Sequence, residues 1–255
     1  MNLKVIIPAH LNSLRLKEKI LIDIHGLPMI EHVRRRVLLS KEISEVIVAT
    51  CDLEIRKIVE GFGGKVIMTS NNHQNGTSRV AEAVSKIVCS HVLIVQGDEP
   101  LIHPEHINLM VKSILNNKKI KIWNGITSLN SIDDLTNRDL VKCFVNNKNQ
   151  IGMCFRNNPG FSSFKKLNKS IFKIQGLIAF KKFFLMKLVN EPPSQFELAE
   201  SIEQMRSIEN GNQIRSVMLN KSFSSINNLE ELKEVRNILK KNKLEKEILN
   251  AIKNN

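Results

Sequence analysis

The stretch VLIVQGDEPLI (92–102) decides the fold, because an apolar run turns abruptly into a polar loop. Its first four residues have the pattern of a strand that is buried on both faces, as in a parallel sheet. Open α/β sheets bind their ligands just beyond the carboxyl ends of such strands. Asp98 stands there and is a suitable ligand for a hard cation such as Mg²⁺, while Gly97 permits a close approach of the backbone. An ordinary strand-to-loop turn with solvated acids fits this segment, taken alone, equally well.

A second apolar run, LKVIIPA (3–9), leads into a basic loop. The loop, residues 10–20, carries Arg15, Lys19 and the hydroxyl group of Ser13. Lysine binds phosphate as a mobile point charge and arginine binds it as a planar fork, so the loop is a candidate triphosphate site. It does not contain the P-loop pattern G-x-x-x-x-G-K-[ST], which excludes that class of phosphate site.

Apolar runs alternate with amphipathic patterns between these two loops. Strands are expected at 45–50 and 65–70, and a polar loop at 71–79 leads into another helix. The first helix (29–38) has one apolar face, and its arginines at 34–36 are expected to be solvated on the opposite face. Such alternation predicts a parallel sheet with helices on both faces.

The loops at 10–20, 71–79 and 96–100 are therefore expected at one edge of one sheet, and together they resemble the 3-deoxy-manno-octulosonate (Kdo) cytidylyltransferases, or CMP-Kdo synthetases. Weaker similarity continues towards the carboxyl end and covers nearly the whole chain. The strongest segments are IIPAHLNSLRLKEKILIDIHGLPMIEHV (6–33), VIMTSNNHQNGTSRVAEA (66–83) and VLIVQGDEPLI (92–102); the weaker ones are NRDLVKCFV (137–145), FKIQGLIAF (172–180), SQFELAESIEQMR (194–206) and SINNLEELKEV (225–235).

The resemblance implies an α/β fold: a Rossmann-like, mixed but mostly parallel sheet flanked by helices, with a small β-rich dimerisation lobe. It implies a single nucleotidyltransferase domain over residues 1–255. About 1–115 would form the nucleotide-binding half, and about 116–255 the sugar-acid-binding and dimerisation part.

The implied activity is transfer of CMP from CTP to a 3-deoxy-octulosonate-type sugar acid, with release of pyrophosphate, for lipopolysaccharide or capsule synthesis. The resemblance also implies Mg²⁺ as cofactor, a homodimer, and no covalent enzyme intermediate. Positioning and electrostatics would then provide the rate enhancement.

The resemblance assigns roles to residues of this chain. Arg15 and Lys19 would stabilise charge as pyrophosphate leaves, and Asp98 is the third catalytic residue. The metal ligands would be Asp98 and Asn227. The sugar acid would be bound by Arg156, Gln175, Glu197 and Glu200. The implied nucleotide site consists of His10, Ser13, Met68, Thr69, Ser70, Thr77, Arg79, Gln96 and Gly97.

Several positions depart from the family's usual pattern. His10 stands where arginine is usual, and Asn227 where aspartate is usual, so the hold on triphosphate and on Mg²⁺ is expected to be weaker. Ile174, Ile178 and Leu198 replace hydrogen-bonding residues on the sugar side. Two alternatives therefore stand beside the first function: the same chemistry on a different acid sugar, and a catalytically impaired paralogue that binds nucleotide.

The net charge of +13 requires a nucleic-acid partner to be considered. Aromatic residues make up only 5% of the chain and tyrosine is absent, so a base-stacking surface, and with it nucleic-acid binding, is not expected. Part of the excess charge lies in the tail, residues 240–255, which is expected to be a solvated helix end.

Other features limit where the protein acts. No apolar run is long enough to span a bilayer and no signal peptide is visible, so membrane insertion is not expected. Cys51, Cys89, Cys143 and Cys154 form neither a C-x-x-C pair nor a zinc spacing. They are expected to be free thiols in a reducing cytoplasm.

The rest of the chain predicts mostly local structure. The pattern gives a helix at 104–116, a strand at 121–129 and a β-hairpin at 141–156. Residues 157–170 have the composition of a mobile loop. A helix at 228–239 is expected to pack through Leu229, Leu232, Val235 and Leu239.

Overall fold

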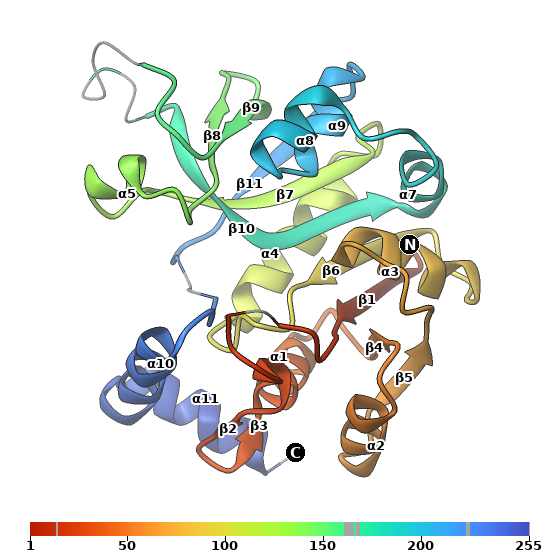
Figure 1. The fold of residues 1–255 in the computed structure, drawn as a ribbon, viewed down its shortest axis with the longest axis vertical. Coiled ribbons are helices and arrows are strands. Elements are labelled where there is room, and N and C mark those ends of the chain that lie inside the picture. Colours follow the sequence, from red (N-terminus) through yellow and green to blue (C-terminus); the bar gives the residue numbers. More distant parts are fainter. Residues whose placement is uncertain (14, 161–165, 167–168, 223–224, 255) are drawn as a thin grey trace. The chain divides into compact units, whose positions relative to one another are not determined.

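The computed structural model describes residues 1–13, 15–160, 166, 169–222 and 225–254. The chain divides into two compact units (Figure 1). The first unit contains Met1–Asn108 and Phe223–Asn255, and the second contains Leu109–Ser222. The division falls within helix α4 (Pro104–Asn116).

The first unit is built on four parallel strands. β4 (Val46–Thr50) pairs with β5 (Lys65–Met68) and with β1 (Leu3–Pro8), and β1 pairs in turn with β6 (His91–Val95). β4 is buried along its whole length, as expected of a strand covered on both faces. The intervening helices are α1 (Met29–Leu38), α2 (Leu53–Gly61) and α3 (Gly76–Ser85), so the predicted alternation of strand and helix is confirmed.

Short elements and the carboxyl-terminal segment complete this unit. The loop after β1 contains the 3₁₀ helix η1 (Lys19–Leu21) and a small hairpin of β2 (Asp23–Ile24) and β3 (Leu27–Pro28). The chain returns to this unit with α10 (Leu229–Lys241) and α11 (Lys243–Lys253). The expected helix at 228–239 is thus confirmed, although Leu229 is 60% exposed and does not pack as predicted.

The second unit is built on a mixed sheet. β7 (Ile122–Thr127) pairs in parallel with β11 (Ile214–Met218) and antiparallel with β10 (Ile171–Lys181). β8 (Lys142–Val145) and β9 (Gln150–Phe155) form the expected hairpin, and each also joins the larger sheet. The described helices of this unit include the end of α4, together with α5 (Asp133–Thr136), α7 (Lys182–Leu188), α8 (Gln195–Glu200) and α9 (Gln204–Glu209).

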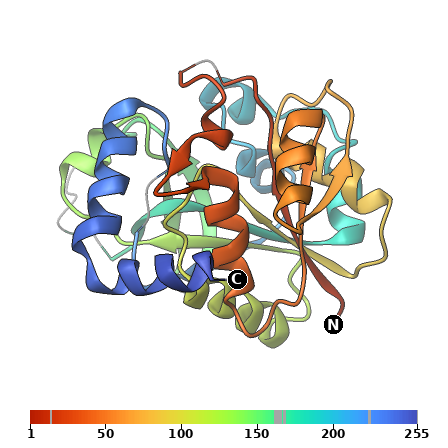
Figure 2. The ribbon, with the colours of Figure 1, turned by 90° about the horizontal axis from the view of Figure 1, so that it is seen from below.

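The carboxyl-terminal tail differs from the sequence prediction. Figure 2 shows α11 beside α1, and Ile248, Leu249 and Ile252 of α11 are buried. The prediction of a solvated tail was therefore wrong, because an amphipathic helix with a charged face was mistaken for one without a packing partner. Residues 223–255 accordingly belong with the first unit, whereas the sequence had grouped them with 116–222.

The arginines of α1 were also predicted wrongly, since Arg34, Arg35 and Arg36 are all buried. Arg34 pairs with Glu31 within the helix at 2.7 Å. The Nη1 atom of Arg35 donates to the backbone oxygen of Ile252 at 2.7 Å. Arg36, which is fully buried, pairs with Glu245 of α11 at 2.6 Å. The sequence of α1 alone does not reveal that α11 covers it.

Three further expectations concern the loop at 157–170, the cysteines and membrane-spanning helices. Residues 161–165 and 167–168 of the expected mobile loop lie outside the described residues. All four cysteines are free. Among the described residues, none of the helices combines the length and the apolar character that crossing a bilayer would take.

The ion pair between Arg36 and Glu245 allows a test of what stabilises the packing of α11 against α1. In Glu245→Gln, the Arg36 charge stays buried without its counter-charge, although the amide can still accept a hydrogen bond. We expect the free energy of unfolding, measured by urea denaturation, to fall by about 3 kcal/mol. The control is Glu60→Gln, which breaks the exposed pair with Arg56 and should cost less than about 1 kcal/mol. An equal loss of unfolding free energy in the two variants would show that the buried ion pair does not stabilise the packing of α11.

Candidate active site

The first group of site residues gathers around the ammonium group of Lys19. Lys19 is the first residue of η1, and Asp98 lies three residues beyond the end of β6. The Nζ atom of Lys19 lies 2.5 Å from Oδ2 of Asp98. The same atom donates to the backbone oxygen of Ile226 at 3.2 Å and to Oδ1 of Asn227 at 3.4 Å. One cation thus joins the basic loop, the β6 loop and the segment before α10.

Hydrogen bonds hold both the side chain and the backbone of Asn227. Its Oδ1 atom accepts a second bond from Nη2 of Arg15 at 3.1 Å, and its backbone nitrogen donates to Oε2 of Glu231 at 2.5 Å. The neighbouring Ile226 donates its backbone nitrogen to the backbone oxygen of Asp98 at 2.9 Å. The structure therefore brings the four expected catalytic and metal residues, Arg15, Lys19, Asp98 and Asn227, into one cluster.

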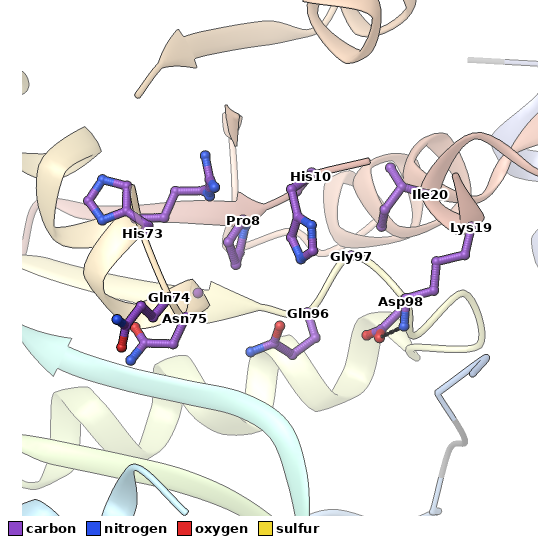
Figure 3. Close-up of a pocket in the computed structure, with 13 residues that line it drawn as sticks. Pro8, His10, Lys19, Ile20, His73, Gln74, Asn75, Gln96, Gly97 and Asp98 are labelled. Atoms are coloured by element: carbon purple, nitrogen blue, oxygen red, sulfur yellow. Dashed lines mark hydrogen bonds and ion pairs between the residues drawn. The ribbon is translucent and has the colours of Figure 1, made fainter. Parts of the chain in front are cut away.

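A pocket opens beside this cluster (Figure 3). Figure 3 shows Lys19 and Asp98 facing each other at one end of the pocket, and Gln74 with Asn75 at the other. The lining includes four of the nine expected nucleotide residues, namely His10, Arg79, Gln96 and Gly97. The full lining is Pro8, Ala9, His10, Lys19, Ile20, His73, Gln74, Asn75, Gly76, Arg79, Gln96, Gly97 and Asp98.

The other five expected nucleotide residues are not part of this lining. Met68 ends β5, and Thr69 and Ser70 follow it. Thr77 lies in the first turn of α3. Ser13 lies in the basic loop, six residues before Lys19.

Two glycines let the backbone close in on the pocket. A Cβ atom at Gly97 would lie 3.1 Å from Cδ1 of Ile20 and 3.3 Å from Cγ2 of Ile7. A Cβ atom at Gly76 would lie 3.0 Å from Cγ of Pro8. These distances are tighter than ordinary side-chain contacts, so a larger residue at either position would require the neighbouring side chains to shift by a few tenths of an ångström.

The start of α3 forms one wall of the pocket. Asn75 caps the helix, because its side chain accepts a bond from the backbone nitrogen of Ser78 at 2.8 Å. The free backbone N–H groups and positive end of a helix favour an anionic ligand. Arg79, only 4% exposed, donates through Nη1 to Oγ1 of Thr69 at 2.8 Å and to the backbone oxygen of Ser70 at 3.3 Å. Arg79 therefore connects the pocket wall to the segment that follows β5.

Sequence reasoning missed Glu82, which bonds to two residues of the loop between β5 and α3, the loop that lines one end of the pocket. Its carboxylate lies 2.6 Å from Nε2 of His73 and accepts the backbone N–H of Ser70 at 2.9 Å. It also pairs with Lys86 at 2.7 Å. Hydrogen bonds from Lys86 and His73, and then from Ser70, lower the pKa of Glu82 to about 2. Glu82 and His73 lie nine residues apart on opposite sides of a helix start, a spacing that by itself signals no contact.

His10 carries little charge at neutral pH in this site. Burial lowers its pKa below the ordinary value of 6.5, and the neighbouring Arg79 lowers it further. Asp52 and Asp98 act in the opposite direction and Lys19 in the same direction. The imidazole can therefore hydrogen-bond to a phosphate, but it adds little to the positive charge around one.

The four expected sugar-acid residues lie in the second unit and make contacts within it. Arg156 donates through Nε to the backbone oxygen of Glu200 at 2.9 Å, and its backbone nitrogen donates to Oε2 of Glu200 at 3.1 Å. Both carboxylate oxygens of Glu197 accept bonds from Arg206 at 2.6 Å. Gln175 is 3% exposed and donates to Oγ1 of Thr127 at 3.2 Å. The structure thus brings Arg156 and Glu200 together but gives Glu197 a separate partner.

A buried amide organises the strand that carries Gln175. The pairing of β10 with β7 is interrupted by a bulge between Ile174 and Ile178. Asn124 of β7, which is fully buried, donates through Nδ2 to the backbone oxygens of Gln175 at 3.0 Å and Leu177 at 3.1 Å. Its Oδ1 atom accepts a bond from Gln204 at 2.9 Å. Sequence analysis missed Asn124, since an asparagine in an apolar run gives no sign of its partners.

The donors of the cluster limit the kind of metal that it could hold. Across the described part of the chain, no group of three or more histidine, cysteine, aspartate or glutamate residues is placed to bind a metal ion. Asp98 and Asn227 offer oxygen atoms close together, around Nζ of Lys19. Such a pair suits a hard cation that takes its remaining ligands from phosphate and water.

Comparison with known proteins identifies the family of this chain. The family model for cytidylyltransferases matches residues 4–214. The 3-deoxy-manno-octulosonate cytidylyltransferase of Geobacter sulfurreducens is 36% identical over 228 residues, which are 85% of this chain and 91% of that protein. The protein of the same name from Francisella tularensis subsp. holarctica is 34% identical over 247 residues, 93% of this chain and 98% of its own length.

Solved structures agree with the sequence comparison. A CMP:2-keto-3-deoxy-manno-octonic acid synthetase complexed with CTP matches with a TM-score of 0.88 and 30% identity, over 94% of this chain and 99% of that one. A 4-diphosphocytidyl-2C-methyl-D-erythritol synthase from Anaerococcus prevotii matches with a TM-score of 0.63 at 16% identity, which supports the fold alone. The expected α/β fold of nucleotidyltransferase type is confirmed. The chain belongs to the cytidylyltransferase family, among the 3-deoxy-manno-octulosonate cytidylyltransferases.

Proposed function

We propose that this nucleotidyltransferase joins CMP from CTP to Kdo and releases pyrophosphate. The observation that carries the proposal is the cluster of Arg15, Lys19, Asp98 and Asn227 beside a pocket at the end of β1 and β6. The cluster supplies phosphate-binding cations and a carboxylate, and the start of α3 forms a wall of the pocket. These are the kinds of group that bind a nucleoside triphosphate.

The reaction forms one bond and breaks one. A hydroxyl oxygen of the sugar acid attacks the α-phosphorus of CTP and loses its proton, while the bond from that phosphorus to the β-phosphate bridging oxygen breaks. Lys19 and Arg15 would stabilise the charge that develops on the departing pyrophosphate. His10 and the start of α3 would orient the phosphates. The pocket thus contributes mainly by positioning and by fixed charge.

The donor set fits Mg²⁺ as the cofactor. Mg²⁺ is commonly bound by one or two carboxylates together with substrate phosphates and water. Asp98 and Asn227 would hold it, and the bound ion would supply neutralisation of phosphate charge. Because Asn227 contributes an uncharged oxygen, Asp98 is the one anionic ligand of this pair.

Two observations favour the alternatives. Ile174 and Ile178 flank the bulge of β10, and an aliphatic side chain leaves sugar hydroxyl groups without partners, which would suit a different acid sugar. The largely uncharged His10 and the neutral Asn227 would suit a slow or inactive paralogue that binds nucleotide.

The setting of the enzyme is likewise inferred from its family. We infer a homodimer whose product serves lipopolysaccharide or capsule synthesis. The four free cysteines support a reducing compartment such as the cytoplasm.

The function is tested by measuring pyrophosphate release from CTP with Mg²⁺ and Kdo, against a panel of other acid sugars and nucleotides. Turnover with Kdo and CTP is the expected result. Turnover on another acid but not Kdo would identify a specificity variant. CTP binding without turnover on any acid would identify the nucleotide-binding paralogue.

The metal site makes a paired prediction. Asp98→Asn removes the charged ligand, and we expect kcat to fall about 100-fold or more. Asn227→Asp adds a charged ligand and should lower the Mg²⁺ concentration needed for half-maximal rate by about tenfold. Both are read from pyrophosphate release over a Mg²⁺ titration. Unchanged turnover in Asp98→Asn would remove Asp98 from the metal site.

Glu82 makes a prediction about the nucleotide loop. Glu82→Gln weakens the bonds to His73 and Ser70, so we expect KM for CTP to rise about tenfold with a smaller change in kcat. The pKa of Glu82 is depressed, so its stabilising effect is present at neutral pH and is lost as pH falls from about 4.5 towards 2. Thermal unfolding of the variant should therefore depend less on pH in that window. Glu60→Gln is the control, and the idea fails if both variants have the same KM for CTP.

A further inference from the structure

The positive charge of the protein is concentrated in the second unit. Residues 109–222 contain 18 lysines and arginines and 8 aspartates and glutamates, a net charge of +10 out of the total of +13. A bias of the whole chain towards lysine would instead spread the excess over both units. The distribution therefore indicates a local reason for charge in the second unit.

Five lysines of this unit form a surface that we call the lysine patch: Lys118, Lys119, Lys121, Lys181 and Lys182. Two chain segments bring them together, the turn after α4 and the junction of β10 with α7 (Figure 1). The backbone nitrogen of Lys181 donates to the backbone oxygen of Lys121 at 2.9 Å, and Nζ of Lys181 donates to the backbone oxygen of Lys118 at 2.5 Å. The cluster is therefore fixed by the fold.

Little negative charge is available near the lysine patch from its own chain segments. Residues 106–132 and residues 140–190 contain no aspartate or glutamate. Lys118, Lys119 and Lys121 are exposed to solvent. Like charges held this close repel one another, and an anionic surface brought against them would remove that repulsion.

An exposed aromatic residue directly follows Lys181 and Lys182 in the chain. Phe183, in the first turn of α7, is 62% exposed, whereas the next residue, Phe184, is 2% exposed. Lys121 lies over the ring of Phe184, with Nζ 5.3 Å from the ring centre. One exposed apolar residue thus directly follows two lysines of the patch in the chain. Lysines together with an exposed aromatic residue are the composition of surfaces that lie on anionic membranes. Binding of single-stranded nucleic acid instead uses successive aromatic residues along a groove.

We propose that the lysine patch, with Phe183, docks the protein reversibly on the surface of an anionic phospholipid bilayer. The lysines contact lipid phosphates and Phe183 enters the interface between headgroups and acyl chains. This is peripheral binding and involves no membrane-spanning segment. It is independent of the chemistry at the pocket.

The test is co-sedimentation of the whole protein with vesicles of phosphatidylcholine, with and without phosphatidylglycerol. We expect binding only when phosphatidylglycerol is present. Raising salt from about 0.1 M to about 1 M shortens the screening length from about 10 Å to about 3 Å and should release the protein. Each lysine near an anionic surface strengthens binding about fivefold, so the double variant Lys118→Glu with Lys119→Glu should bind at least about 25-fold more weakly.

A matched control separates the lysine patch from the overall charge. Lys233→Glu with Lys246→Glu makes the same change in net charge on the exposed faces of α10 and α11, and it should bind vesicles as the unaltered protein does. Phe183→Ser should weaken binding at constant charge. Equal loss in both double variants, equal binding to pure phosphatidylcholine, or binding of RNA in place of vesicles would each overturn the proposal. Pyrophosphate release in solution should be unchanged in all these variants, so this test does not depend on the proposed catalytic function.

Discussion

The candidate site depends on the contact of the Lys19 ammonium group with oxygen atoms from two other parts of the chain. Asp98 and Asn227 are separated by more than half of the sequence, and neither lies near Lys19 along it. A carboxylate that loses part of its hydration needs a counter-charge, and Lys19 provides one at 2.5 Å. The Mg²⁺ ion that we propose would compete with Lys19 for the same oxygen atoms.

The carboxyl-terminal segment stabilises this arrangement from outside the pocket. Ile226 bonds directly to the backbone of Asp98. Farther along, Glu245 of α11 pairs with Arg36, whose Nη1 atom also lies 3.3 Å from the backbone oxygen of Ile102, just after the β6 loop. Burial of a charged residue such as Arg36 is tolerated only with such partners. The last helix thus supports the loop that carries Asp98, although it contributes no residue to the pocket.

Much of the first unit could be predicted from the sequence. The strands, the helices between them and the position of Asp98 beyond β6 all follow from apolar periodicity and from the rule that ligands bind at the carboxyl edge. Arg15 and Lys19 followed from the basic loop after the first strand, whereas Asn227 came from the family resemblance alone. Their meeting point could not have been derived from spacing, because Asn227 reaches Asp98 only through the return of the chain to this unit.

The residues that sequence reasoning missed share a physical cause. Arg36, Glu82 and Asn124 are polar side chains whose roles are set by partners distant in sequence or across a helix start. Periodicity assigns a charged residue to solvent by default, as it did for Arg34 to Arg36, because it contains no information about the next layer of structure. The hydrogen bonds of Asn124 to the bulge of β10 arise likewise from tertiary packing.

The two neutral positions of the proposed site would act on different charges, His10 on the positive charge around a triphosphate and Asn227 on the negative charge around a metal ion. His10 is largely uncharged because burial and Arg79 lower its pKa. Asn227 reduces the negative charge that would attract Mg²⁺. A largely uncharged His10 leaves Lys19 and Arg79 as cations of the described pocket lining, with Arg15 beside it on Asn227. Lys19 is bound to Asp98 and Arg15 to Asn227, so the same two contacts that assemble the site also determine how much charge it can offer to CTP.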